Sequence, residues 1–202
     1  MSPDNHLVAF VKAPRLGRVK TRLASDIGVV GAWTFYRRVL RAVLTRLEAD
    51  RRWRCWLAIT PDSAVEVEAL WPRGWRRIGQ GRGDLGRRMA TVMRDLPPGP
   101  AVIVGTDVPA IGPDPIARAF RALGRHDAVF GPAADGGYWL VGLRRRPRLP
   151  AIFDGVRWST EHALGDTLAN MGALDVAMLE QLEDVDDGAA FARWRERTAR
   201  AS

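Results

Sequence analysis

The sequence predicts an α/β fold, a three-layer α/β/α sandwich on a mixed, mostly parallel sheet. Short runs of apolar and β-branched residues alternate with longer stretches of helical periodicity. Residues 101–105 are apolar on both faces, as a central parallel strand should be. No linker rich in Pro, Gly or Ser divides the 202 residues, so we expect residues 1–202 to form a single domain.

The N-terminal half alternates strand and helix patterns. Residues 7–11 form an unbroken apolar run, which predicts the first strand, and 32–47 predict a helix. One face of that helix is apolar: Phe35, Val39, Ala42, Val43 and Leu47. A second apolar run predicts a strand at 56–60. A helix at 62–70, a weaker strand at 76–80 and a helix at 85–95 follow.

The C-terminal half begins with the central strand at 101–105. A helix at 115–123 follows, then strands at 128–131 and 138–143. Ser159 or Thr160 is the type of residue that caps a helix, so we expect one to begin there. A last helix is expected from about Ala189.

Composition limits the function classes. The formal charge is +8, but the arginines are spread over predicted helix faces and residues 180–187 are acidic, so a nucleic-acid partner is not favoured. The single cysteine, Cys55, lies in an apolar run. No apolar stretch approaches the roughly 20 residues of a membrane span, and a signal-peptide pattern is absent. We expect a cytoplasmic protein, and the sequence leaves open whether it forms a homo-oligomer.

Lysine usage marks one loop. Of 31 basic residues only Lys12 and Lys20 are lysines, and both lie within residues 10–23. A lysine is a compact, mobile point charge that reaches a single phosphate oxygen, whereas arginine is a planar fork. We interpret this loop as a phosphate-binding site, with Gly17 permitting a tight turn and Pro14 stiffening it. The alternative is two lysines that fell by chance on a solvated basic loop.

A carboxylate follows the central strand, and ligands of such sheets bind beyond the carboxyl ends of strands. Asp107 comes directly after residues 101–105. Mg²⁺ (or Mn²⁺) takes one or two protein carboxylates and completes its shell with water and phosphate oxygens, so Asp107 is a candidate metal ligand. The alternative is a capping or turn role before the next helix.

Two later segments carry further candidates. Residues 131–139 contain Asp135 and a glycine pair beside aromatics, which fits a substrate-lining loop, although Asp-Gly also suits a hairpin turn. Residues 183–187 are acidic, and Asp184 or Asp186 could supply a second metal ligand. Carboxylates before a helix also interact favourably with its dipole, which is the alternative for this segment.

Together these residues resemble the bacterial glycosyltransferase-like proteins associated with arsenosugar biosynthesis, which are related to phospholactate guanylyltransferase and share the GT-A nucleotide-diphospho-sugar transferase fold. The resemblance covers most of the chain. The residues that carry it are Phe10, Lys12, Pro14, Gly17, Lys20, Thr21, Arg22 and Leu23; Gln80, Gly83, Asp84, Leu85, Gly86, Arg88 and Met89; Gly105, Asp107 and Pro109; Gly131, Pro132, Ala133, Asp135, Gly136, Gly137 and Tyr138; and Phe153, Trp158, Ser159 and Thr160.

The resemblance implies a nucleotide held by the N-terminal loop and the Gly83 region, a metal on Asp107, and the second substrate near Gly136. The glycosyltransferase Asp-x-Asp motif is absent after the central strand, where Asp107 stands alone, as in nucleotidyltransferases. We expect a transferase that uses Mg²⁺ and a nucleotide donor, an NDP-sugar or alternatively an NTP, with a small-molecule acceptor.

The predicted roles fall into four groups. Catalysis is assigned to Lys20, Asp107 and Asp135, with Asp135 as the base for the acceptor hydroxyl; nucleotide binding to Lys12, Pro14, Gly17, Lys20, Arg22, Gln80, Gly83 and Asp84; metal binding to Asp107, Asp184 and Asp186; and substrate binding to Gly136, Gly137, Tyr138, Trp158, Ser159 and Thr160.

Two other functions compete. Residues 81–86 match the G-x-G-x-x-G pattern of NAD-binding oxidoreductases, but the preceding strand is short and arginine-rich, and Asp84 would repel a pyrophosphate. A basic RNA-binding domain would need exposed aromatics on successive strands, and the sequence lacks that pattern.

Overall fold

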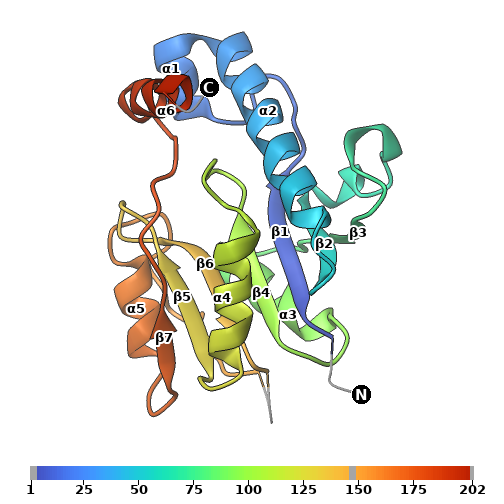
Figure 1. Cartoon of the computed structure of the whole chain (residues 1–202), viewed down its shortest axis with the longest axis vertical. Helices are drawn as coiled ribbons and strands as arrows, with labels where there is room; N and C mark the ends of the chain where they lie inside the picture. The colour runs from blue at the N-terminus through green and yellow to red at the C-terminus, as the bar shows by residue number, and fades with distance from the viewer. Residues whose placement is uncertain (1–3, 146–148, 201–202) are drawn as a thin grey trace.

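A computed structural model describes residues 4–145 and 149–200. Its centre is a seven-stranded sheet in the order β3-β2-β1-β4-β6-β5-β7 (Figure 1). The strands are β1 (His6–Lys12), β2 (Arg54–Thr60), β3 (Arg76–Gly79), β4 (Ala101–Gly105), β5 (Ala128–Pro132), β6 (Tyr138–Leu143) and β7 (Val176–Met178). β6 is antiparallel to β4 and β5, and the other neighbours pair in parallel. The predicted mixed, mostly parallel sheet is confirmed.

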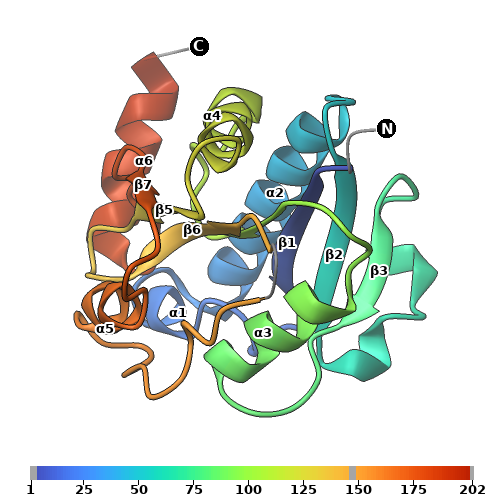
Figure 2. The same ribbon diagram turned by 90° about the horizontal axis from the view of Figure 1, so that it is seen from below.

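Helices cover both faces of the sheet. They are α1 (Thr21–Ile27), α2 (Val29–Glu48), α3 (Leu85–Asp95), α4 (Pro113–Leu123), α5 (Ala163–Ala169) and α6 (Gly188–Arg200). Figure 2 shows α2, α4 and α6 on one side and α3 and α5 on the other. The three-layer α/β/α arrangement is therefore confirmed.

The alternation of side chains along β1 explains why two cores form. Leu7, Ala9 and Val11 belong to the cluster beneath α2 and α4, whereas Val8 belongs to the cluster beneath α3. All four side chains are buried. Burying a valine or leucine side chain contributes about 1.5–3 kcal/mol, so a parallel strand apolar on both faces fits only between two helical layers.

Two predicted helices differ from the structure. The stretch 62–70 forms two separate 3-10 turns, Asp62–Ala64 and Glu68–Leu70. The β-branched Val65 and Val67 between them disfavour a continuous helix.

The helix expected to begin at Ser159 or Thr160 begins later, at Ala163, with His162 before it. Ser159 has a left-handed backbone (φ 62°), which a helix cannot include. The Thr160 hydroxyl donates to the Arg157 carbonyl at 2.7 Å and accepts the His162 N–H at 3.2 Å, so it belongs to the turn before α5. Two elements, α1 and β7, are absent from the sequence prediction, and both are short.

The strand order brings the loops after β1 and β4 together at one edge of the sheet. Because β1 and β4 are adjacent and parallel, their carboxyl ends meet at one edge of the sheet, and α1 and the start of α6 lie beyond that edge (Figure 1). Within the described part of the chain, no helix is both long and apolar enough to cross a membrane.

Candidate functional site

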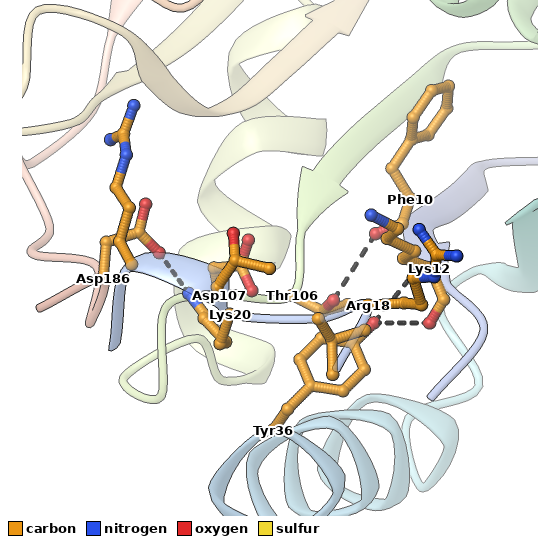
Figure 3. A pocket seen from close by; sticks show the side chains of 11 residues that line it. Phe10, Lys12, Arg18, Lys20, Tyr36, Thr106, Asp107 and Asp186 are labelled. Atoms are coloured by element: carbon orange, nitrogen blue, oxygen red, sulfur yellow. Dashed lines mark hydrogen bonds and ion pairs between the residues drawn. The ribbon is translucent and has the colours of Figure 1, made fainter. Parts of the chain in front are cut away.

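A pocket of about 230 Å³ lies at the carboxyl ends of β1 and β4 (Figure 3). Its lining residues are Phe10, Lys12, Arg18, Val19, Lys20, Thr21, Arg22, Tyr36, Thr106, Asp107 and Asp186. The loop before α1 supplies cations, and the exit of β4 and the segment before α6 supply carboxylates. The structure thus brings together five predicted site residues from three distant segments: Lys12, Lys20, Arg22, Asp107 and Asp186.

Lys20 is the centre of this pocket. Its ammonium lies 3.0 Å from Asp107 Oδ1 and 2.5 Å from Asp186 Oδ1. The lysine side chain is 5% exposed, whereas the two carboxylates are 50% and 42% exposed. Burial disfavours the charged ammonium, but Asp107 and Asp186 outweigh it and raise the pKa of Lys20 above its ordinary value.

The backbone of Lys20 is also unusual. It adopts the left-handed conformation (φ 48°, ψ 48°) immediately before α1. A residue other than glycine rarely adopts this conformation, and its strain persists only where other contacts hold the residue in place. Here the Lys20 carbonyl accepts the Ala24 N–H at 2.9 Å, which ties this backbone to the first turn of α1.

Helix α2 braces the loop that carries the lysines. The Tyr36 hydroxyl donates to the Lys12 carbonyl at 2.7 Å and accepts from the Lys12 N–H at 3.1 Å. The Trp33 indole donates to the Pro14 carbonyl at 2.7 Å. Burial, with a smaller effect from Asp107, raises the pKa of Tyr36 well above its usual range, so its hydroxyl stays protonated. Pro14 and Gly17 shape this loop and do not line the pocket.

Asp107 does not cap the following helix. α4 begins at Pro113 after Gly112, without a capping side chain. The carboxylate of Asp107 is directed instead to Lys20, and its backbone carbonyl accepts the Val185 N–H at 3.3 Å. The C-terminal segment is therefore attached to the exit of β4.

The acidic segment divides its residues between two roles. Asp187 caps α6, since its Oδ1 accepts the Ala190 N–H at 2.8 Å, while the neighbouring Asp186 is directed into the pocket. Burial, followed by the charges of Asp186 and Asp135, raises the pKa of Asp184 to about 6.

The carboxylate pair has the chemistry of a site for a hard divalent cation. Oxygen ligands are those that Mg²⁺ and Mn²⁺ prefer, and the Lys20 ammonium lies between Asp107 and Asp186 as a stand-in cation. Among residues 4–145 and 149–200, no group of three or more His, Cys, Asp or Glu side chains is arranged to hold a metal ion. Asp184 is therefore not brought into one ligand set with the other two.

Gln80 has a structural position between strands. Its buried amide donates to the carbonyls of Val11 at 3.2 Å and Ala58 at 2.8 Å, and its oxygen accepts from Arg88 at 2.8 Å. These bonds fix the loop after β3 against β1 and β2. A nucleotide contact by Gln80 stays a prediction.

Gly83 and Asp84 lie outside the pocket as well. Asp84 caps α3 by accepting the Arg87 N–H at 2.8 Å, and Gly83 provides the positive φ of 109° before it. The G-x-G-x-x-G stretch that contains them follows β3, one of the two edge strands of the sheet. The dinucleotide fingerprint belongs instead to the turn after a buried first strand, so the geometry here does not match it.

The loop between β5 and β6 is a hairpin that packs closely against the segment before α5. Asp135 accepts the Gly137 N–H at 2.9 Å, as the turn alternative requires. A Cβ at Gly136 would lie 2.2 Å from the Glu161 carbonyl oxygen, and the residue has φ 83°. Glycine is therefore required where the segment before α5 crosses the hairpin.

Aromatic side chains also join the β5–β6 hairpin to the segment before α5. The rings of Tyr138 and Trp158 meet edge to face with centroids 6.3 Å apart. The predicted substrate residues Gly136, Gly137, Tyr138, Trp158, Ser159 and Thr160 are thus in two adjoining segments, although none of them lines the pocket around Lys20.

Several pocket residues had no assigned role in the sequence prediction. Tyr36 lies next to Phe35 on the buried side of α2, and only its polar tip distinguishes it from a core aromatic. Thr106, whose hydroxyl donates to the Phe10 carbonyl at 3.4 Å, precedes Asp107 and could have been included with it. Arg18 lies inside the lysine loop, where its charge was the available signal.

Solved structures with the same fold include enzymes that use nucleotides. A protein from Desulfovibrio desulfuricans G20, described as a "putative nucleotide-diphospho-sugar transferase", matches with a TM-score of 0.85 and 29% identity over 98% of this chain and 96% of its own. CMP:2-keto-3-deoxy-manno-octonic acid synthetase, complexed with CTP, matches at 0.62 and 12% over 99% and 100%. Rv0371c from Mycobacterium tuberculosis H37Rv, in complex with manganese, matches at 0.60 and 17% over 97% and 100%. The last two likenesses establish the fold alone.

The sequence comparisons identify a family. No curated protein matches the sequence. The model of the family described as "Uncharacterized protein conserved in bacteria (DUF2064)" matches residues 43–160, which is more than half of the chain and includes β4 and Asp107. The chain therefore belongs to the DUF2064 family.

Proposed function

We propose that the protein is a nucleotide-dependent transferase, and that its reaction is glycosyl transfer from an NDP-sugar to a small acceptor. The observation that carries the proposal is the convergence of Lys12, Lys20 and Arg22 with Asp107 and Asp186 in one pocket at the carboxyl edge of the sheet. Such a set of charges suits a diphosphate and its counter-cation. The 29% identical protein described as a nucleotide-diphospho-sugar transferase supports this choice, as does the resemblance to the arsenosugar-type glycosyltransferase-like proteins.

The residues have distinct roles in this reaction. As the bond between the anomeric carbon and the diphosphate oxygen breaks, Lys12, Lys20 and Arg22 neutralise the charge that develops on the leaving diphosphate. Asp135 takes the proton of the acceptor hydroxyl while its oxygen forms the new bond to the anomeric carbon. A divalent cation held by Asp107 and Asp186 would supply further neutralisation of the diphosphate.

Nucleotidyl transfer is the second candidate, and one observation favours it. Asp107 has no partner carboxylate at the Asp-x-Asp spacing, because Gly105 and Pro109 occupy those positions. In this reaction an acceptor oxygen attacks the α-phosphorus of an NTP and pyrophosphate leaves with the bonding electrons. The same cations would neutralise the pyrophosphate.

A thermal-shift panel followed by product analysis tests the proposal. NTPs and NDP-sugars are added with Mg²⁺, with Mn²⁺ and with a chelator. A ligand at about 100 times its Kd stabilises the folded state by about 2.7 kcal/mol. Nucleoside diphosphate released from an NDP-sugar supports glycosyl transfer, and pyrophosphate released from an NTP supports nucleotidyl transfer. Stabilisation by NAD without metal, or RNA binding with a steep salt dependence and no nucleotide effect, would overturn both.

A further inference from the structure

Asp107 and Asp186 are held in place by contacts that do not involve Lys20. The Asp107 carbonyl accepts the N–H of Val185, whose side chain is fully buried. On the other side of Asp186, Asp187 caps α6, and the Gly188 N–H donates to Asp26 Oδ2 at 2.7 Å. Because both flanks are fixed, the backbone positions of the carboxylates persist when the lysine moves.

Lys20 is the movable member of the cluster. Its ammonium is at the end of four methylene groups, and both of its partners are about half exposed toward the pocket (Figure 3). Two cations cannot occupy the space between the same carboxylate oxygens, because their charges repel at contact distance. A divalent cation that takes the Oδ1 atoms of both Asp107 and Asp186 must therefore displace the ammonium.

We propose that Lys20 is an internal counter-cation. In the ligand-free protein its ammonium occupies the divalent-cation position between Asp107 and Asp186, and it moves to the donor's phosphates when metal and nucleotide bind. The inference rests on the proposed function, since a phosphate must receive the ammonium. It follows that metal alone binds weakly and that a bound diphosphate strengthens metal binding, and by linkage the metal strengthens diphosphate binding by the same factor.

Lys20→Met provides the first test, because methionine keeps the length of the side chain without its charge. The probes are Mn²⁺ alone and inorganic pyrophosphate, which contains the phosphate linkage common to NDP-sugars and NTPs. We expect the affinity for Mn²⁺ alone to rise roughly tenfold and the affinity for pyrophosphate to fall roughly tenfold, a change of about 1.4 kcal/mol in each case. A purely structural role would lower both affinities.

Lys12→Met is the matched control, because Lys12 lines the same pocket without an ion pair to either carboxylate. It should weaken pyrophosphate binding and leave the affinity for Mn²⁺ alone within about twofold, since exposed charges are screened by salt.

A second measurement uses the wild-type protein and does not depend on the folding of a variant. Acetylation by an amine-reactive reagent is followed by mass spectrometry at Lys20, with Lys12 as the internal reference. Saturating Mn²⁺ should displace the buried Lys20 side chain into solvent, where its unprotonated amine, the form that is acetylated, becomes accessible to the reagent. The rate at Lys20 should then rise roughly tenfold relative to Lys12, and added pyrophosphate should protect Lys20 again.

The outcomes separate the two proposals. If Mn²⁺ and pyrophosphate bind the wild type but Mn²⁺ leaves the relative rate at Lys20 unchanged, or Lys20→Met does not strengthen Mn²⁺ binding, the transfer of Lys20 is wrong and the proposed function stands. If neither probe binds the wild type, the proposed function fails and this inference fails with it.

Discussion

Asp107 lies two residues past β4, between a buried strand and an exposed pocket. Asparagine in its place keeps the shape of the side chain but leaves the buried Lys20 ammonium with Asp186 as its remaining ion-pair partner in the described residues. We expect Asp107→Asn to lower the free energy of unfolding of the metal-free protein by about 1 kcal/mol, a small change because the carboxylate is half exposed. Nucleotide affinity in Mg²⁺ should fall at least about tenfold.

Both effects of Asp107→Asn are tested by measuring the melting temperature and the nucleotide affinity, each with Mg²⁺ and with a chelator. Asp187→Asn is the matched control, because it lies next to Asp186 and asparagine caps a helix as well as aspartate does. Mg²⁺-dependent affinity that survives Asp107→Asn would show that Asp107 does not hold a metal against the phosphates.

At this scale the sequence predicted the position of these residues in one pocket better than it predicted their partners. The lysine composition and the strand exit pointed to Lys12, Lys20 and Asp107, and all three line the pocket. The contact between Lys20 and Asp186 spans 166 positions, and no local pattern reports such a pair. The ion pairs therefore required the folded chain.

At the scale of elements, α2 positions the lysine loop through Tyr36. Phenylalanine there keeps the buried ring and removes both hydrogen bonds to the Lys12 backbone. We expect Tyr36→Phe to lower the free energy of unfolding by about 1–2 kcal/mol and to weaken nucleotide binding several-fold, because the loop loses its brace.

Chemical denaturation and nucleotide titration test this expectation. Ser25→Ala is the control, because it removes an exposed hydroxyl on α1 whose contact with the Thr21 carbonyl is long, at 3.5 Å. Equal affinity of Tyr36→Phe and wild type would mean that the loop keeps its shape without α2.

The contact between the β5–β6 hairpin and the segment before α5 depends on one glycine. A methyl group at Gly136 would collide with the backbone of Glu161, at distances of 2.2 to 2.7 Å, and the left-handed φ adds strain. We expect Gly136→Ala to destabilise the protein by about 2–4 kcal/mol, because backbone atoms must move to admit it.

Gly165→Ala supplies the comparison. Gly165 lies in α5 with open space around it, so alanine there should stabilise by about 0.5–1 kcal/mol. Thermal unfolding of the two variants and the wild type gives the change in stability that each substitution causes. A melting temperature of Gly136→Ala equal to that of the wild type would show that the segments can separate without cost.

The elements absent from the sequence prediction are short, although other short elements, such as β3 and β4, were predicted. α2 extends over 20 residues, and its periodic apolar face is visible in the sequence. β7 has three residues and α1 has seven, too few to show a period. The 62–70 stretch has helical composition, but its β-branched residues and its place between two strands favour short turns.

At the scale of the whole molecule, a buried histidine couples stability to pH. His6 is 1% exposed at the start of β1, where its Nδ1 accepts the Trp56 indole N–H at 3.2 Å and its Nε2 lies 3.4 Å from the Pro98 carbonyl. The neutral ring satisfies both contacts, whereas a second proton would place two donors face to face. Burial, and to a lesser degree Arg145, lowers the pKa of His6 below 6.5.

The sign of the effect follows from proton binding. Below a pH of about 6.5 the unfolded chain takes up a proton at His6 that the folded protein excludes, so stability falls as the pH falls through this window and on toward the lowered pKa. His6→Gln should reduce the loss of unfolding free energy between about pH 8 and pH 5, as measured by denaturant titration at each pH. A variant with the same pH dependence as the wild type would contradict this role.

The lysine loop and the segment before α6 meet although one is near the start of the sequence and the other near its end. A ribosome makes the chain from its N-terminus, so Lys12 and Lys20 leave it long before Asp186 exists. Until then the cations have no partner from the C-terminal segment, and the pocket has one wall missing. Assembly of the candidate site thus waits for the C-terminal segment: a chain interrupted before Asp186 lacks one of the two carboxylates that Lys20 contacts.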